Sequence, residues 1–252
     1  MARLTRLDLP LVVHHVCIRG NNGEPIAREA HDLDEMARLW QDTSLSLRVK
    51  VHGYAFLSTS VHALVTPMEE GVLSAFMQAV GRRYVQFFNR KYARTGTLWE
   101  GRFRSHVLQA DPWLISSLVY LDGLCEAAGL AWSREVGGMA SSSASSSDRH
   151  DAHTPGVNRY PWSSHAHWVG QRLDPLVAAH ESMWHLGNTP FEREVHYADR
   201  VGQRLAPAQI QAIESALRSG WPLGDAEFVA HLQKLTSRRL EPRRPGRPRQ
   251  AD

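Results

Sequence analysis

The chain has 252 residues, 42% of them hydrophobic, and a formal net charge of +3, which suffices for one large or two small domains with a hydrophobic core. No run of about 18 apolar residues is present and the first residues lack the apolar core of a signal peptide, so we expect a soluble, cytoplasmic protein. Cys17 and Cys125 lie too far apart in sequence to indicate a disulfide framework or a thiolate metal site, and we expect both to be buried.

The first part of the chain alternates strand and helix patterns. Residues 9–19 are rich in β-branched side chains and end at a Gly-Asn-Asn-Gly turn, which predicts a strand. Residues 32–47 carry apolar side chains at helical spacing, after acidic residues that suit a first helical turn. Residues 49–65 then predict two strands with a Ser-Thr-Ser break between them.

A long amphipathic helix is predicted over residues 71–94, where apolar positions recur every three or four residues and most arginines fall on the opposite face. A strand is predicted at 103–108, followed by a helix from Pro112 toward Gly129. The order is β-α-β-β-α-β with one further helix. This order predicts an α+β fold with a ferredoxin-like antiparallel sheet.

The composition changes at residues 136–156, which are rich in serine and glycine and would bury too little apolar surface to offset the entropy lost on ordering. Tyr160-Pro-Trp-Ser-Ser164 then resembles a turn whose aromatic side chains pack back onto a core. We therefore predict a first domain over 1–135, a flexible linker over 136–156, a C-terminal helical region over 157–237 and a basic tail over 238–252. Within the helical region, helices are predicted at 174–186, 191–204, 207–219 and 225–237.

Basic residues gather in two clusters. One spans the 71–94 helix and the strand after it; the other is the tail, where six arginines between 238 and 249 stand beside one glutamate, Glu241. Localised positive charge on a chain of small net charge indicates a polyanionic partner such as DNA. A solvated helix face and a disordered tail are the alternative explanation for either cluster. The candidate DNA-binding residues are Arg82, Arg83, Arg90, Lys91, Arg94, Arg102, Arg104, Arg243, Arg244, Arg247 and Arg249.

One predicted strand carries two residues whose spacing is that of a metal-binding pair. Ser60 and His62 are two positions apart, so both point to the same face of that strand. A His-X-His pair would make this face a metal site, but serine stands at the first position. With a divalent ion on that face, a tyrosine such as Tyr120 could attack phosphorus and form a phosphotyrosine. On spacing alone, the alternative that His62 and Tyr120 are simply packed in the core is favoured.

Eight segments in a fixed order resemble a known family. They include His52-Gly-Tyr-Ala-Phe-Leu-Ser-Thr-Ser-Val-His62 and Tyr120-Leu-Asp-Gly-Leu124. The sequence resembles the REP-associated tyrosine transposases, a branch of the single-tyrosine HUH transposases that act on single-stranded DNA. The matching segments are 15–21, 52–65, 83–90, 96–103, 120–130, 160–164, 186–193 and 246–249.

The resemblance implies an HUH transposase fold, a nucleophile at Tyr120 and a Mg²⁺ or Mn²⁺ ion held in part by His62. The family pattern has histidine where this chain has Ser60, and a polar amide where it has Leu124, one helical turn after Tyr120. Two of the three expected ligands are therefore replaced, and neither serine nor leucine substitutes for a nitrogen ligand. Asp122 is a poor replacement, because at two residues from Tyr120 it faces away on a helix.

Two hypotheses from different classes follow. In the first, the protein is still a metal-dependent single-strand endonuclease and strand transferase, with water, DNA phosphate, His14, His15 or His106 completing a weaker site. In the second, it is a DNA-binding module that keeps the fold without catalysis. We expect a protein that binds single-stranded or REP-like hairpin DNA, with impaired cleavage through Tyr120 and a nucleoid location. A monomer is favoured, and a dimer is the alternative.

Further sequence features fit DNA binding. Trp99 and Tyr92 are candidates for stacking on unpaired bases, whereas Phe103 is expected in the core. The tail is similar to an AT-hook, in which arginines lie in a narrow A·T minor groove. The C-terminal helices are either a helix-turn-helix-like reader of duplex DNA or a brace for the first domain.

Overall fold

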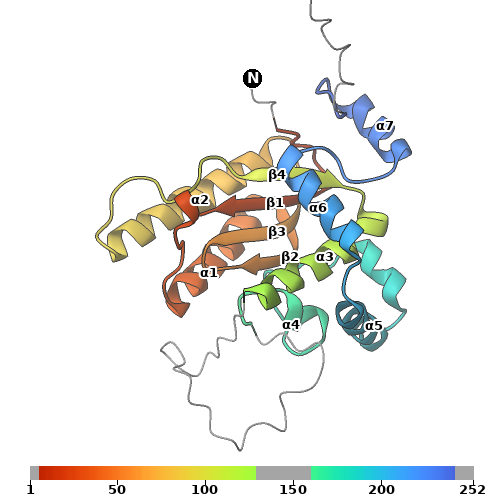
Figure 1. The fold of residues 1–252 in the computed structure, drawn as a ribbon, viewed down its shortest axis with the longest axis horizontal. Helices are drawn as coiled ribbons and strands as arrows, with labels where there is room; N and C mark the ends of the chain where they lie inside the picture. Colours follow the sequence, from red (N-terminus) through yellow and green to blue (C-terminus); the bar gives the residue numbers. More distant parts are fainter. Residues whose placement is uncertain (1–5, 129–159, 242–252) are drawn as a thin grey trace, which may run out of the picture.

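A four-stranded antiparallel sheet organises residues 6–128 and 160–241, the part of the chain that the computed structural model describes (Figure 1). The strands are β1 (Val13–Arg19), β2 (Val49–Phe56), β3 (Ser60–Pro67) and β4 (Arg104–Leu108), in the spatial order β2-β3-β1-β4. Helix α1 (Ala30–Ser46) connects β1 to β2, and α2 (Val72–Lys91) connects β3 to β4. The predicted ferredoxin-like α+β arrangement is confirmed. Strand β1 begins later than predicted, because Leu11 has a positive φ of 62° that a strand does not adopt.

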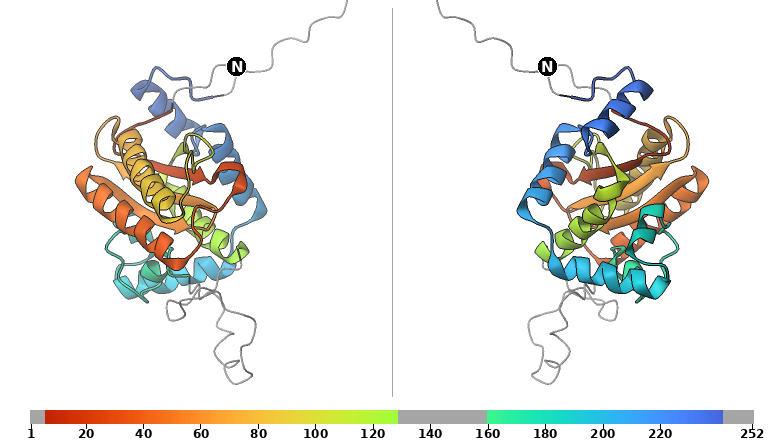
Figure 2. Two further views of the ribbon diagram at one scale, coloured as in Figure 1. Left: turned by 90° about the vertical axis from the view of Figure 1, so that its left-hand side faces the viewer. Right: turned by 90° about the vertical axis from the view of Figure 1, so that its right-hand side faces the viewer.

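Helices α1 and α2 lie side by side on one face of the sheet, as Figure 2 shows. Their apolar positions bury large aromatic side chains against the strands, among them Trp40, Phe76 and Tyr84. The Asp32 carboxylate accepts the backbone N–H groups of Arg28 and Glu29, which would otherwise be unpaired at the start of α1. This face is therefore closed by apolar packing.

The opposite face of the sheet is covered by α3 (Ala110–Ala127) and by α6 (Pro207–Ser219). Gly53 lets α3 approach β2 closely, since a Cβ atom there would lie 2.2 Å from a methyl carbon of Leu118. Helix α6 packs over β4 and β1 through Ile213, Ala216 and Leu217, as a brace for the sheet would. The candidate site lies on this face of the sheet, where Tyr120 of α3 neighbours His15 of β1 and His62 of β3.

The remaining C-terminal elements are α4 (His165–Trp168), a 3-10 helix η2 (Glu181–Leu186), α5 (Pro190–Gln203) and α7 (Ala226–Leu235). The predicted starts at Pro190, Pro207 and Asp225 are confirmed, with the Asp225 carboxylate accepting the Phe228 N–H at 2.7 Å. None of the described helices combines the length and the apolar composition needed to cross a lipid bilayer.

The predicted helix over 174–186 is wrong in its first half. The backbone of this stretch pairs with the edge of β2 instead: Val177 bridges Val51, and the Ala178 N–H donates to the Val51 carbonyl at 2.7 Å. Asp174 accepts the Leu176 N–H and the Tyr54 hydroxyl, which holds the extended conformation in place. Hydrogen bonds to a distant strand therefore outweigh the local helical pattern.

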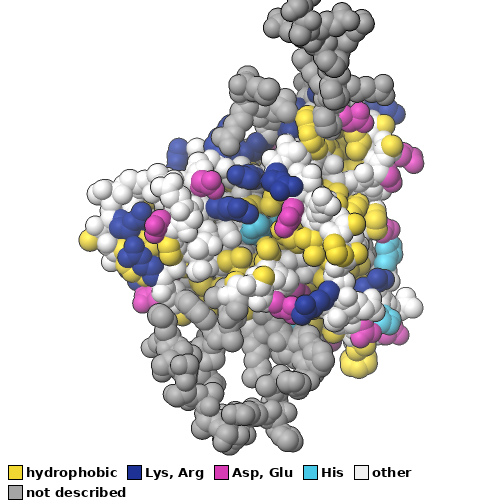
Figure 3. All heavy atoms as spheres, in the orientation of Figure 1, with side chains coloured by type: hydrophobic (Ala, Val, Ile, Leu, Met, Phe, Trp, Pro, Cys, Tyr) yellow, Lys and Arg dark blue, Asp and Glu magenta, His cyan; other side chains and the backbone are white. Residues whose placement is uncertain are grey.

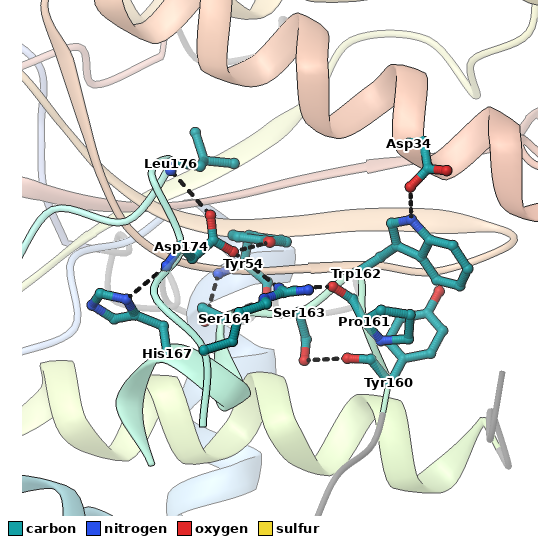
Figure 4. A network of polar contacts seen from close by, with 11 residues as sticks. Asp34, Tyr54, Tyr160, Pro161, Trp162, Ser163, Ser164, His167, Asp174 and Leu176 are labelled. Atoms are coloured by element: carbon teal, nitrogen blue, oxygen red, sulfur yellow. Dashed lines mark hydrogen bonds and ion pairs between the residues drawn. The ribbon is translucent and has the colours of Figure 1, made fainter. Parts of the chain in front are cut away.

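Segments from the C-terminal region cover both edges of the sheet. At β2, the Phe56 N–H donates to the Trp162 carbonyl at 2.9 Å, and the Trp162 indole N–H reaches Asp34 on α1 (Figure 4). At β4, the Leu223 N–H donates to the Val107 carbonyl at 2.8 Å. The expectation that Tyr160–Ser164 docks onto a core is confirmed, because Tyr160 and Trp162 are buried. No long strand edge is left for pairing with another chain in the described residues.

Candidate active site and nucleic-acid interface

Four side chains that contain nitrogen or sulfur lie together on the sheet face beneath α3 and α6. Cys17 of β1 pairs in register with His62 of β3, and His15 of β1 pairs with His106 of β4, so all four point to this face. His15 Nε2 lies 3.3 Å from His62 Nδ1, and His62 Nε2 lies 3.4 Å from the Cys17 Sγ atom. The sheet register alone brings together residues that are 45 or more positions apart in sequence.

Tyr120 lies directly over this cluster on the inner side of α3. Its ring centre is 5.9 Å from that of His15 and 6.5 Å from that of His62. The side chain is 8% exposed, so its edge reaches the surface. The sequence-predicted pair of Tyr120 and His62 is thus brought together, with His15 of β1 as a neighbour of both rings.

Burial controls the protonation of the cluster. It lowers the pKa of His15 to about 3 and the pKa values of His62 and His106 well below the ordinary value of 6.5. Burial also raises the pKa of Tyr120 to about 12, and the charges of Glu214 and Arg19 act on it in opposite directions. At neutral pH the site therefore holds neutral imidazoles beside a protonated phenol.

The residues present do not fit the Mg²⁺ or Mn²⁺ ion that the family resemblance implies. Both ring nitrogens of His62 already contact neighbours, and the nearby donors are nitrogen and sulfur rather than the oxygens that Mg²⁺ prefers. Leu124 lines an apolar cavity of ≈ 520 Å³ beside Tyr120 and offers no ligand atom. Among residues 6–128 and 160–241, no three His, Cys, Asp or Glu side chains are arranged to hold a metal ion.

Asp122 faces away from Tyr120, as its position on the helix predicted. Its carboxylate lies 2.7 Å from His165 Nδ1 and accepts the Tyr197 hydroxyl at 2.8 Å. Both partners, one on α4 and one on α5, are fully buried. Asp122 therefore ties the C-terminal region to α3 and takes no part in the site.

The predicted basic residues differ in what they contact. Lys91 is 2.5 Å from Asp32 and also pairs with Glu29, and Arg83 donates to Thr43. In contrast, Arg102 and Arg104 are exposed and form no ion pair with another described residue. Arg82 and Arg90 are exposed on α2, and the Arg94 guanidinium lies over the Phe88 ring. The predicted residues Arg243, Arg244, Arg247 and Arg249 lie outside the described residues.

An open groove of ≈ 760 Å³ runs between α2 and the loop before β4. Trp99 is half-buried in its wall, with the indole N–H 3.4 Å from the Gly81 carbonyl, and Arg82 and Arg102 lie at its rim. Phe103 is buried beneath the Arg6 guanidinium, in agreement with its predicted core position. Tyr92 lies elsewhere, with its hydroxyl donated to Asp32. Trp99 and Phe103 thus both line the groove, and Trp99 is the more exposed of the two.

A second, smaller cavity of ≈ 70 Å³ lies between the ends of β1 and β4. Cys17, Arg19, Glu100, Arg102 and Arg104 line it. Figure 3 shows basic side chains gathered beside a histidine on this face of the molecule. Arg19 was not among the predicted site residues. Its signal was the period-two spacing from His15 through Cys17, which places Arg19 on the same face.

No family model matches the chain, and no protein with a curated description is similar to it. Several solved structures are similar to the chain, including the following two. One is a REP-associated tyrosine transposase bound to a REP hairpin, which is 12% identical over 72% of this chain and 93% of that chain, with a TM-score of 0.48. The other is a proposed transposase from Deinococcus radiodurans R1, which is 12% identical over 48% of this chain and 96% of that chain, with a TM-score of 0.33. At this identity neither similarity extends to the function of this chain. The first of these two proteins belongs to the family that the sequence of this chain resembles.

Proposed function

We propose that the protein binds single-stranded or hairpin DNA, as a nucleoid-associated monomer with little or no strand cleavage. The observation that carries the proposal is the groove along α2, which combines Trp99 with the exposed arginines Arg82 and Arg102. Unpaired bases stack on aromatic side chains, while arginines neutralise the neighbouring phosphates. The apolar groove wall and its basic rim suit these two parts of a nucleotide.

Ion pairs within the protein indicate which of the predicted basic residues are available to a DNA phosphate. Lys91 and Arg83 direct their charge toward Asp32, Glu29 and Asp42, so they offer less to a DNA phosphate. Arg82, Arg102 and Arg104 form no such ion pair with another described residue. We therefore place the interface at the β4 side of α2 rather than along the whole helix.

The test is fluorescence anisotropy with a labelled single strand and a labelled hairpin. The Trp99→Ala variant should bind both about tenfold to a hundredfold more weakly, because one stacked base contributes about 1–3 kcal/mol. Trp184→Ala is the matched control, since Trp184 is 59% exposed and belongs to η2. Equal affinity of Trp99→Ala and the unchanged protein would remove the groove from the interface.

Strand cleavage through Tyr120 is the second candidate function. It is favoured by the position of Tyr120 beside His15 and His62. In that reaction the phenol oxygen bonds to phosphorus, one deoxyribose oxygen leaves, and the phenol gives up its proton. A phenol with a pKa raised to about 12, next to imidazoles whose pKa values are lowered by burial, opposes that proton loss. The pKa values therefore support impaired strand cleavage through Tyr120.

A covalent adduct assay separates the two candidates. The protein is incubated with a hairpin single strand and Mg²⁺ or Mn²⁺, and denaturing electrophoresis shows whether DNA remains attached. We expect no adduct; an adduct that disappears in Tyr120→Phe would establish cleavage. The combined replacement of Ser60→His and Leu124→Asn should raise adduct formation if the absence of these two ligands is what limits the reaction.

A further inference from the structure

We infer that the cavity between the ends of β1 and β4 holds one phosphate group of the DNA strand, through Arg19, Arg102 and Arg104. The inference rests on the proposed DNA binding and specifies where the backbone of the strand lies. It also assigns a site residue, Arg19, that neither the basic clusters nor the helix pattern indicated. The positive charge at this site comes from arginines of the chain itself.

The charge around the cavity is not balanced within the protein. Three arginines and one carboxylate, that of Glu100, line it, and none of the three arginines forms an ion pair with another described residue. Arg38, in contrast, contacts Glu35 and Asp42 at 2.7 Å. Like charges held close together repel one another, so an anion bound among them relieves a cost that the free protein bears.

The cavity lies next to the reactive side chains. Cys17 lines it, and the Cys17 sulfur is 3.4 Å from His62, which in turn neighbours Tyr120. Burial raises the pKa of Tyr120, and the positive charge of Arg19 opposes that rise, as expected for a guanidinium near the phenol. Since the neighbouring histidines are neutral, the arginines are the cations available to a phosphate at this end of the sheet.

Arg102 links this cavity to the Trp99 groove, because its side chain lines both. The smaller cavity is bordered by charged side chains, and the larger groove is mainly apolar. A strand with its phosphate among the arginines can therefore place a neighbouring base against Trp99. The small cavity would then hold the phosphate of one nucleotide, and the groove would hold its base.

The test measures anisotropy of a labelled single strand across a salt series. Replacing Arg19→Ala and Arg104→Ala together should weaken binding about tenfold to a hundredfold. The slope of log affinity against log salt should become shallower by about 0.7 for each phosphate that the variant no longer neutralises. Arg48→Ala is the matched control: Arg48 is exposed, pairs with Glu69 and precedes β2. Circular dichroism confirms that each variant is folded.

A chemical substitution in the DNA sharpens the test. Strands that each carry one uncharged methylphosphonate, at successive positions, are compared on the unchanged protein and on the Arg19→Ala, Arg104→Ala variant. We expect one position to weaken binding to the unchanged protein and to have no effect on the variant. Equal salt slopes and equal methylphosphonate effects on both proteins would overturn the inference and leave DNA binding intact. Failure of the unchanged protein to bind DNA would overturn the proposed function and the inference with it.

Discussion

Three buried histidines, His15, His62 and His106, face one another across β1, β3 and β4, and no carboxylate of the described residues acts on their pKa values. His106 has no hydrogen-bond partner for either ring nitrogen among the described residues. The folded protein keeps these rings neutral, while the unfolded chain protonates them below a pH of about 6.5. The unfolded state therefore binds more protons as the pH falls, and the free energy of unfolding decreases with it.

We expect the free energy of unfolding to fall on acidification below about pH 6.5, by up to about 1.4 kcal/mol per pH unit for each histidine kept neutral. For His15 the decrease continues until the folded pKa of about 3 is reached. Urea unfolding at a series of pH values measures it. In His15→Gln, the free energy of unfolding should depend less steeply on pH, by the contribution of one titrating proton. His231→Gln, at an exposed position on α7, should leave this pH dependence unchanged. If the pH dependence of the free energy of unfolding were unchanged in His15→Gln, the His15 imidazole would not be held neutral in the folded protein.

At the scale of elements, the edge of β2 is closed by backbone pairing with residues more than 100 positions away in sequence. Trp162 is 2% exposed, packs against Tyr160 with ring centres 5.4 Å apart, and donates to Asp34 at 2.9 Å. Figure 4 shows both aromatic side chains on the same side of the docking segment. A single segment thus joins the C-terminal region to β2 and to α1.

Trp162→Ala should destabilise the protein by about 3–5 kcal/mol, because it removes a large buried side chain and leaves a cavity between the segment and α1. Trp184→Ala, which removes the same side chain from an exposed position, should change stability by less than about 1 kcal/mol. Thermal and urea unfolding measure both. Similar values for the two variants would mean that the segment does not anchor the sheet edge.

The ferredoxin-like order of strands and helices could be predicted from the sequence, because apolar residues in the first part of the chain recur at the spacing of a strand or of a helix. Period-two spacing in β3 also indicated that Ser60 and His62 share one face of that strand. The extended stretch from Asp174 could not be predicted, since its hydrogen bonds go to Tyr54 and Val51 on a strand far away in sequence. Nor could spacing show that His62 uses both ring nitrogens, which depends on how the neighbouring strands align.

At the scale of the whole molecule, the C-terminal region closes the sheet that the N-terminal part builds. Tyr160–Ser164 covers β2, and Leu223 covers β4. Helix α6 adds apolar packing over β4 and β1. The described parts of the chain therefore share one sheet and its core, although the sequence suggested a first domain ending at residue 135.

A fragment of residues 1–135 should aggregate, because both outer strands would present unpaired N–H and C=O groups. Light scattering and size-exclusion chromatography, compared with the full chain, measure it. A chain ending at residue 241 is the control: it keeps the segments that cover both sheet edges and should match the full chain in oligomeric state. A fragment 1–135 that stays folded and does not associate would show that the edges need no cover.

The chemistry of the cavity at the ends of β1 and β4 has a consequence for how solution conditions act on the protein. Its cations are guanidinium groups rather than imidazoles, and burial lowers the pKa of the neighbouring His62 well below its ordinary value. DNA affinity should therefore be nearly constant between about pH 6 and 8, where histidine-based sites change charge. The same affinity should fall steeply with added salt. Ionic strength rather than acidity would then regulate how much DNA the protein holds.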